Sequence, residues 1–257
     1  MENLKPVERL AEIVQRLRAP DGCPWDREQT HESLRGLLVE ECHEVVEAIE
    51  SRDDTNLREE LGDLLLHIVM HAQLASERGA FALSDVAGTI CEKMIRRHPH
   101  VFGGTQMDDS EAVLKQWDEI KRAEKPHRKS ALDGIAGGLP ALLKAQTVQK
   151  KAARVGFDWP HIEPVFEKIQ EETLEVREAL AGDDNKALEA EIGDLLFSVV
   201  NLARKSGVDA ETALGATVRR FTRRFEFVER SIEAAGKTMT GSTLEELDGL
   251  WEQAKKA

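Results

Sequence analysis

Two stretches of this chain follow one pattern: EECHEVVEAIESRDDTNLREELGDLL at residues 40–65 and EETLEVREALAGDDNKALEAEIGDLL at residues 171–196. Each stretch holds two acidic residues three positions apart, a short polar interval, and a second acidic pair with the same spacing. A constant offset of 131 residues relates the four acids of the first stretch, Glu41, Glu44, Glu60 and Asp63, to those of the second, Glu172, Glu175, Glu191 and Asp194. A charged pattern repeated in register predicts two tandem units of similar structure.

The residues around both stretches have the apolar spacing of α-helices. Val and Leu recur every three or four positions over residues 7–17, 34–49 and 57–68, and each set predicts one helix. The chain contains no Tyr and no alternating β-branched run of useful length, so strand signals are nearly absent. We therefore expect an all-α fold of two tandem helical-bundle units built from helical hairpins.

A linker is predicted between the two units. Residues 126–140, PHRKSALDGIAGGLP, hold two Pro and three Gly and show no periodic apolar stripe. A new helical pattern begins at Ala141. The expected domains are thus residues 1–125 and 141–257.

Composition narrows the class of protein. The 257 residues carry a formal net charge of −13, which argues against a nucleic-acid-binding surface because such a surface must be basic. No apolar run approaches the roughly 18 residues of a membrane span, and the N-terminal stretch lacks the apolar core of a signal peptide. The three widely spaced cysteines form neither a disulfide framework nor a zinc pattern. We expect a cytoplasmic protein without nucleic-acid or membrane partners.

One acid of each first pair is predicted to lie on the apolar face of its helix rather than on the face exposed to solvent. On a helical wheel, Glu41 and Glu172 lie inside the apolar stripes of their helices, where an unpaired carboxylate is costly. The short polar interval after each helix predicts an antiparallel neighbour, so all four acids of a unit converge. Oxygen-only ligands suit Mg²⁺, or Mn²⁺ in its place. A solvated acidic face would explain a single acidic pair, but two pairs repeated at a fixed offset and in phase with the stripe favour metal binding. A di-iron site using Glu40 and His43 is disfavoured because His43 points away from the stripe and its counterpart is Leu174.

Mg²⁺ in proteins often binds substrate phosphates, and phosphates also attract basic side chains. The sequence places such side chains close together. The basic run Arg220, Arg223 and Arg224 stands out in an acidic protein, and Trp251 with Lys255 offers base stacking and a phosphate contact. Further candidate substrate-binding residues lie near the second acid set: Lys168, Glu171 and Asn201. Their counterparts Leu37 and Met70 in the first unit replace Lys168 and Asn201, so we expect the second unit to be the main catalyst.

These residues resemble the MazG family of nucleoside triphosphate pyrophosphohydrolases. The resemblance rests on E-E-x-x-E followed by E-x-x-D inside E-L-G-D-L, on the tandem layout, and on residues 153–159, ARVGFDW. It covers essentially the whole chain. It implies Mg²⁺-dependent hydrolysis of a nucleoside triphosphate to a monophosphate and pyrophosphate, with water attacking the α-phosphorus.

The resemblance also implies a homodimer, broad acceptance of ribo- and deoxyribonucleotides, and a role in nucleotide-pool cleaning or starvation signalling. It implies that Arg220, Arg224, Trp251 and Lys255 contact the nucleotide. The acids Glu172, Glu175, Glu191 and Asp194 would then carry catalysis.

Two other functions stay open at this point: a nucleotide sensor with little turnover, and a protein-interaction bundle whose acids are merely solvated. The first unit would be weak, structural or regulatory. Alternatively it acts on a different nucleotide, with His67 and His71 near its acids.

Overall fold

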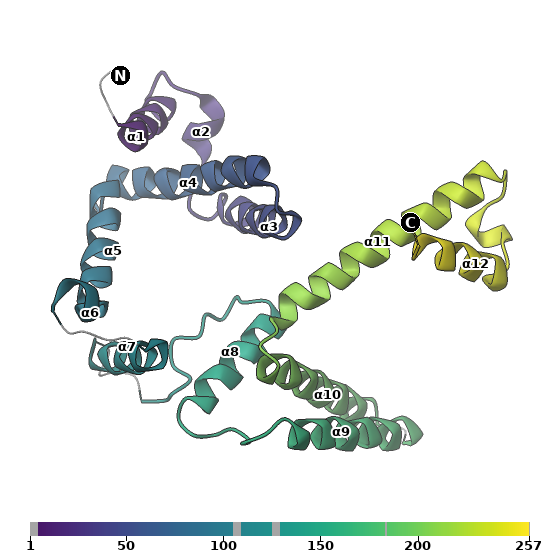
Figure 1. Ribbon diagram of the computed structural model, residues 1–257. Helices are drawn as coiled ribbons and strands as arrows, with labels where there is room; N and C mark the ends of the chain where they lie inside the picture. Colours follow the sequence, from purple (N-terminus) through teal and green to yellow (C-terminus); the bar gives the residue numbers. More distant parts are fainter. Residues whose placement is uncertain (1–4, 105–108, 125–128, 183, 257) are drawn as a thin grey trace. The chain divides into compact units, whose positions relative to one another are not determined.

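The computed structural model describes residues 5–104, 109–124, 129–182 and 184–256 (Figure 1). Over these ranges the regular structure is entirely helical, and no strand is present, which confirms the predicted all-α class. The chain divides into two compact units, residues 1–124 and 125–257. Within the predicted linker 126–140, residues 126–128 lie outside the described residues, and residues 129–140 form turns without a helix.

The first unit contains seven helices in its described residues: α1 (Pro6–Leu17), α2 (Pro24–Glu28), α3 (Arg35–Ser51), α4 (Asp54–Glu77), α5 (Leu83–Arg97), α6 (Pro99–Phe102) and α7 (Ser110–Glu124). Helices α3 and α4 form the hairpin that the first acidic stretch predicts. Arg52 adopts a left-handed conformation (φ 57°) to end α3. Asp53 then caps α4, because its side chain accepts hydrogen bonds from the first backbone N–H groups.

The core of the first unit lies between α1, the segment before α3, and α4. Val14, Leu34, Val69, Met70 and Leu74 are buried together there. Burial of these side chains fixes the rotation of α4 about its axis. That rotation decides which of the residues on α4 face α3.

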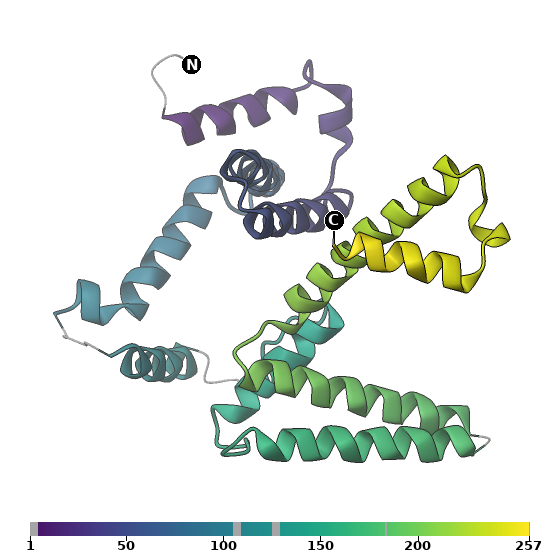
Figure 2. The ribbon, with the colours of Figure 1, turned by 45° about the vertical axis from the view of Figure 1, so that its right-hand side comes forward.

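The second unit repeats the hairpin. Its helices are α8 (Ala141–Ala153), α9 (Glu163–Ala181), α10 (Asn185–Lys205), α11 (Ala210–Ala234) and α12 (Leu244–Ala254), with a 3-10 turn at Met239–Gly241. Helices α9 and α10 run side by side, and Asp184 caps α10 as Asp53 caps α4 (Figure 2). Helix α11 leads away from this hairpin, and α12 folds back onto α11 (Figures 1 and 2).

Buried glutamines hold α8 against the rest of the second unit. The Gln146 amide donates to the carbonyl of Val208 at 2.7 Å, and its oxygen accepts from the N–H of Ala210 at 2.9 Å. Gln149 donates to the carbonyl of Phe197 on α10 at 2.8 Å. The two glutamines thereby satisfy backbone groups at the α10–α11 turn and along α10.

The apolar stripes of the two hairpins are covered only in part. Val165 is fully buried at the start of α9, whereas Leu180 near its end is 63% exposed. Ile49 near the end of α3 is likewise 56% exposed. These ends of the stripes are exposed because near the hairpin tip each helix has a single neighbour. Among the described helices, none is long and apolar enough to span a membrane.

Candidate functional site

Three carboxylates meet in the second unit, two from α9 and one from α10. Glu172, Glu175 and Glu191 each place an oxygen within 4.8 Å of the others. Glu172 is 3% exposed, as its position inside the apolar stripe predicts. Asp194, the fourth predicted acid, lies on α10 at an exposed position outside this group. The hairpin therefore brings three of the four predicted acids of this unit together.

Lys168 stands one turn before Glu172 and contacts this cluster. Its Nζ lies 2.6 Å from Oε1 of Glu172 and 2.9 Å from Oε1 of Glu171. The hydrogen bonds to these two carboxylates raise the pKa of Lys168 above its ordinary value. Burial, followed by the hydrogen bond and charge of Glu172, raises the pKa of Glu175. One ammonium group thus faces three clustered carboxylates, which leaves negative charge for a cation to neutralise.

A matching cluster forms in the first unit. Glu41 on α3 meets Glu60 and Asp63 on α4, with ligand oxygens within 4.8 Å of one another. Burial and the charge of Glu44 raise the pKa of both Glu41 and Glu60. Glu44 itself is exposed and lies outside the group. Both units therefore hold a cluster of three carboxylates shared by the two helices of the hairpin, but the first unit takes one acid from its first helix and two from its second, whereas the second unit takes two and one.

The chemistry of these donors fits a hard divalent cation. Every member of the two clusters offers carboxylate oxygen, and oxygen is the ligand that Mg²⁺ takes in proteins. Mg²⁺ commonly uses few protein carboxylates and completes its shell with water and phosphate oxygens. Three acids pointing toward one small volume, with raised pKa values among them, meet that requirement.

The predicted cationic and aromatic residues gather on α11 and α12. The guanidinium of Arg224 lies 6.0 Å from the centre of the Trp251 ring. Phe221 also packs against Trp251, with 5.0 Å between the two ring centres. Arg220 and Arg223 are exposed on α11. Lys255, exposed at the end of α12, pairs with Glu252. In such a pair the arginine can bind an anion, and the tryptophan can stack against a planar ring.

This cationic group and the acid cluster occupy different helices of the second unit. Helix α12 packs on α11, whereas the acids lie on the α9–α10 hairpin (Figure 1). In the part of the chain that the structure describes, no hydrogen bond or ion pair joins the cluster acids Glu172, Glu175 and Glu191 to these four residues, Arg220, Arg224, Trp251 and Lys255.

Asn201 occupies a buried position on α10 and is already engaged. Its side-chain oxygen accepts two hydrogen bonds from Arg204, at 2.9 and 2.7 Å. Arg204 in turn pairs with Asp158, with Nη2 2.6 Å from Oδ1. The pairing with Arg204 lowers the pKa of Asp158. Sequence reasoning missed Arg204 and Asp158, because 46 residues separate them and only the fold joins them.

The first unit repeats the arginine–tryptophan pair in a neutralised form. Arg97 lies 5.9 Å from the ring centre of Trp117, the counterpart of Arg224 beside Trp251. Here Glu124 accepts hydrogen bonds from both Arg97 and Arg96, and these bonds lower the pKa of Glu124 to about 2. The basic run of the first unit is therefore held by an acid of the same chain.

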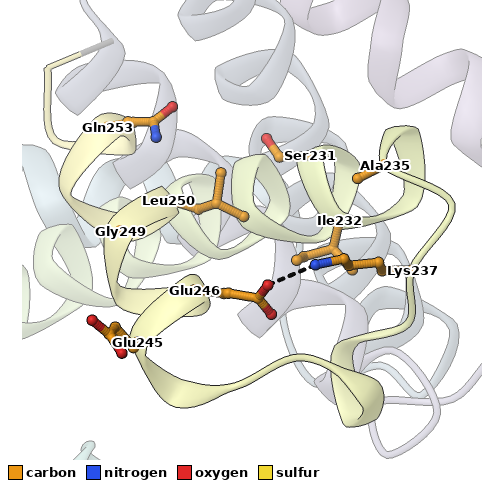
Figure 3. A pocket seen from close by; sticks show the side chains of 9 residues that line it. All are labelled: Ser231, Ile232, Ala235, Lys237, Glu245, Glu246, Gly249, Leu250 and Gln253. Carbon is orange, nitrogen blue, oxygen red and sulfur yellow. Dashed lines mark hydrogen bonds and ion pairs between the residues drawn. The ribbon is translucent and has the colours of Figure 1, made fainter.

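A small pocket of about 290 Å³ lies at the α11–α12 turn (Figure 3). Lys237 and Glu246, which form an ion pair of 2.6 Å, line this pocket together with Ile232 and Leu250. None of its lining residues belongs to the acid clusters or to the arginine–tryptophan pair. This pocket therefore adds nothing to the candidate site.

Known proteins resemble this chain over nearly its whole length. A model of the MazG nucleotide pyrophosphohydrolase domain matches residues 29–102 and 162–228, one segment in each unit. The chain is 50% identical to the nucleoside triphosphate pyrophosphohydrolase/pyrophosphatase MazG of Thermotoga maritima, over 96% of this chain and 95% of that protein. It is 45% identical to the nucleoside triphosphate pyrophosphohydrolase of Escherichia coli, over 98% of each chain. A domain match in both units and this likeness over nearly full length show that the chain belongs to the MazG family.

Proposed function

We propose that this protein hydrolyses nucleoside triphosphates to nucleoside monophosphates and pyrophosphate, with Mg²⁺ held by the acid cluster of the second unit. The observation that carries the proposal is the buried Glu172 among Glu175 and Glu191, with Lys168 beside it. The names of the Thermotoga maritima and Escherichia coli relatives support the same reaction. Asp194, exposed one turn after Glu191, would join the ligands when the ion and substrate are present.

The reaction needs negative charge to be neutralised on both sides of the bond between the α- and β-phosphates. Bound Mg²⁺ would supply Lewis-acid stabilisation of that charge and a source of hydroxide. Lys168 is positioned to exchange its contact with Glu171 for one with a phosphate oxygen, because Glu171 is exposed and Glu172 is not. Glu171, once released, becomes available to orient the attacking water.

Two differences favour the second unit as the main catalyst. Leu37 stands in the first unit where Lys168 stands in the second, so the first cluster has no ammonium group at that position. Glu124 also forms ion pairs with Arg96 and Arg97, whereas Arg224, beside Trp251, has no ion pair among the described residues.

The enzyme would work as a homodimer. Within one chain the acids of α9–α10 and the arginine–tryptophan pair of α11–α12 lie apart, so a complete nucleotide site needs a second copy. The α9–α10 hairpin supports this, because Leu174, Ile192 and Leu196 are between 44% and 56% exposed although they are large and apolar. A second copy would cover this face.

Complementation tests the shared site. At nucleotide concentrations well below KM, Glu172→Gln and Trp251→Ala are each expected to lose most activity, and a mixture of the two is expected to regain part of it. A mixed dimer holds one site with both the intact acids and the intact tryptophan. If both variants are dimeric, exchange subunits and still show no recovery, each chain builds its own site.

Broad specificity follows from the type of contact. A ring stacked on Trp251 with an arginine on its phosphates would accept any base, since every base has a π face. We therefore propose activity on ribo- and deoxyribonucleoside triphosphates alike, in the service of nucleotide-pool cleaning or a starvation response. Comparing kcat/KM across eight nucleotides tests this, with a spread of no more than about tenfold expected.

A substitution series locates the catalytic cluster. With Mg²⁺, Glu172→Gln is expected to abolish hydrolysis, whereas Glu41→Gln retains most of it. Glu178→Gln, an exposed position on the same helix, is the matched control. Retained activity in Glu172→Gln would refute the assignment, and loss in both cluster variants would indicate two working or coupled sites. A nucleotide sensor is the second candidate, and it predicts nucleotide binding without turnover in the wild type.

A further inference from the structure

A histidine stands beside the acid cluster of the first unit, and the second unit has none in that place. His67 lies on α4 one turn after Asp63, so Glu60, Asp63 and His67 share one face of the helix. Its Nε2 is 3.8 Å from Oε1 of Glu41 across the hairpin. At the corresponding position, 131 residues later, α10 carries Ser198.

His67 is buried without a hydrogen bond. The residue is 8% exposed, and its Nδ1 has no partner among the described residues. The 3.8 Å separation from Glu41 is too long for a hydrogen bond but is close to the spacing of two ligands around one ion, which is about 3.0–4.3 Å for bonds of roughly 2.1 Å. Nε2 is therefore the ring nitrogen placed to bind an ion beside Glu41, whereas Nδ1 is the nitrogen that lacks a partner among the described residues.

The histidines near this cluster are not equivalent. The neighbouring His71 is differently placed, because its Nδ1 lies 2.8 Å from Nδ1 of His31 and is already hydrogen-bonded. Among the histidines of this region, His67 is the one that reaches an acid of the cluster.

We propose that the first unit binds a first-row transition-metal divalent cation through Glu41, Glu60, Asp63 and His67, in preference to Mg²⁺. Imidazole nitrogen adds affinity for transition metals and little for Mg²⁺, whose ligands are oxygen. The second unit, with carboxylates alone, would keep the Mg²⁺ site. The two units would thus share a fold and differ in the metal they take, which gives the first unit a role of its own. This inference rests on the proposed function only in treating the acid clusters as cation sites.

Manganese is the probe, because its electron spin reports on bound nitrogen. The full chain carrying Glu172→Gln and Glu175→Gln leaves the first-unit cluster as the intact one. With Mn²⁺ added, electron spin-echo envelope modulation is expected to show the coupling of an imidazole ¹⁴N. The reverse variant, Glu41→Gln with Glu60→Gln, is expected to bind Mn²⁺ without that coupling.

Substitution of the histidine completes the test. In the same background His67→Ser, which copies the second unit, is expected to lose the ¹⁴N signal and to weaken Mn²⁺ binding relative to Mg²⁺ by about tenfold or more. His43→Ser, at an exposed position on α3, is the control and should change neither. Absence of Mn²⁺ binding, absence of ¹⁴N coupling in the parent, or coupling that persists in His67→Ser would each overturn the proposal. These readouts concern metal binding, so they are separate from the turnover measured in Glu172→Gln.

Discussion

Removing one charge from an acid cluster should stabilise the protein when no metal is bound. In the first unit, Glu41 places an oxygen within 4.8 Å of the carboxylates of Glu60 and Asp63, and its side chain is 19% exposed. Two like charges at that distance repel by about 1 kcal/mol in water and by about 3.5 kcal/mol at an effective dielectric constant of 20. Since the cluster is partly solvated, Glu41→Gln is expected to raise the free energy of unfolding by about 1–2 kcal/mol at neutral pH.

The pH dependence of this effect has a definite sign. The pKa of Glu41 is raised in the folded state, so the folded protein binds its proton more tightly than the unfolded chain does. The stability contributed by that proton is fully present below the ordinary carboxyl pKa and is lost as pH rises through the raised folded value. Glu41→Gln should therefore stabilise the protein at pH 7 and have little effect near pH 3.

Calorimetry measures both the higher Tm expected of metal-free Glu41→Gln and the smaller stabilisation that this variant gains from a divalent cation. For a unit of this size, 1 kcal/mol corresponds to a shift in Tm of about 4 °C. Saturating divalent cation, at a hundred times its Kd, is expected to stabilise the wild type by about 2.7 kcal/mol and the variant by much less. Glu47→Gln, exposed on the same helix, is the control. A metal-free Glu41→Gln protein that is less stable than wild type, or one with an undiminished metal effect, would refute the clustered-charge account.

Two further substitutions test contacts in the second unit. Gln146→Leu leaves the carbonyl of Val208 and the N–H of Ala210 buried without partners, so it should lower the free energy of unfolding by about 2–4 kcal/mol in urea titrations; a loss below 1 kcal/mol would show that water replaces the amide. Trp251→Ala should raise the KM for nucleoside triphosphates roughly tenfold through lost stacking. Trp117→Ala, its counterpart in the first unit, should leave KM near the wild-type value, and equal effects would contradict the assignment of the main site.

The hairpins and the buried acids were predictable because they follow from local rules. Helical spacing of apolar residues located α1 and α3 to within two residues and the start of α8, whereas α4 runs nine residues beyond the predicted stretch 57–68. The phase of Glu172 within its apolar stripe predicted its burial, since the same periodicity decides which side faces the neighbouring helix. The repeat transferred the hairpin from one unit to the other but not the membership of the acid clusters, which includes Asp63 in the first unit and Glu175 in the second.

What the sequence left open depends on contacts between distant residues. Asp194 and Glu44 have the spacing of their cluster partners, yet they are exposed, because helix rotation is set by packing along the whole hairpin. Asn201 is held by Arg204, whose orientation depends on Asp158 far along the chain. No local sequence pattern predicts such pairings between distant residues.

The identity of the scissile bond is the most direct test of the central claim. Purified protein is incubated with Mg²⁺ and a nucleoside triphosphate in ¹⁸O-labelled water, and the products are resolved by ³¹P NMR and mass spectrometry. We predict equal amounts of nucleoside monophosphate and pyrophosphate, with the label in the monophosphate because water attacks the α-phosphorus. Nucleoside diphosphate with orthophosphate, or label in the pyrophosphate, would contradict the account.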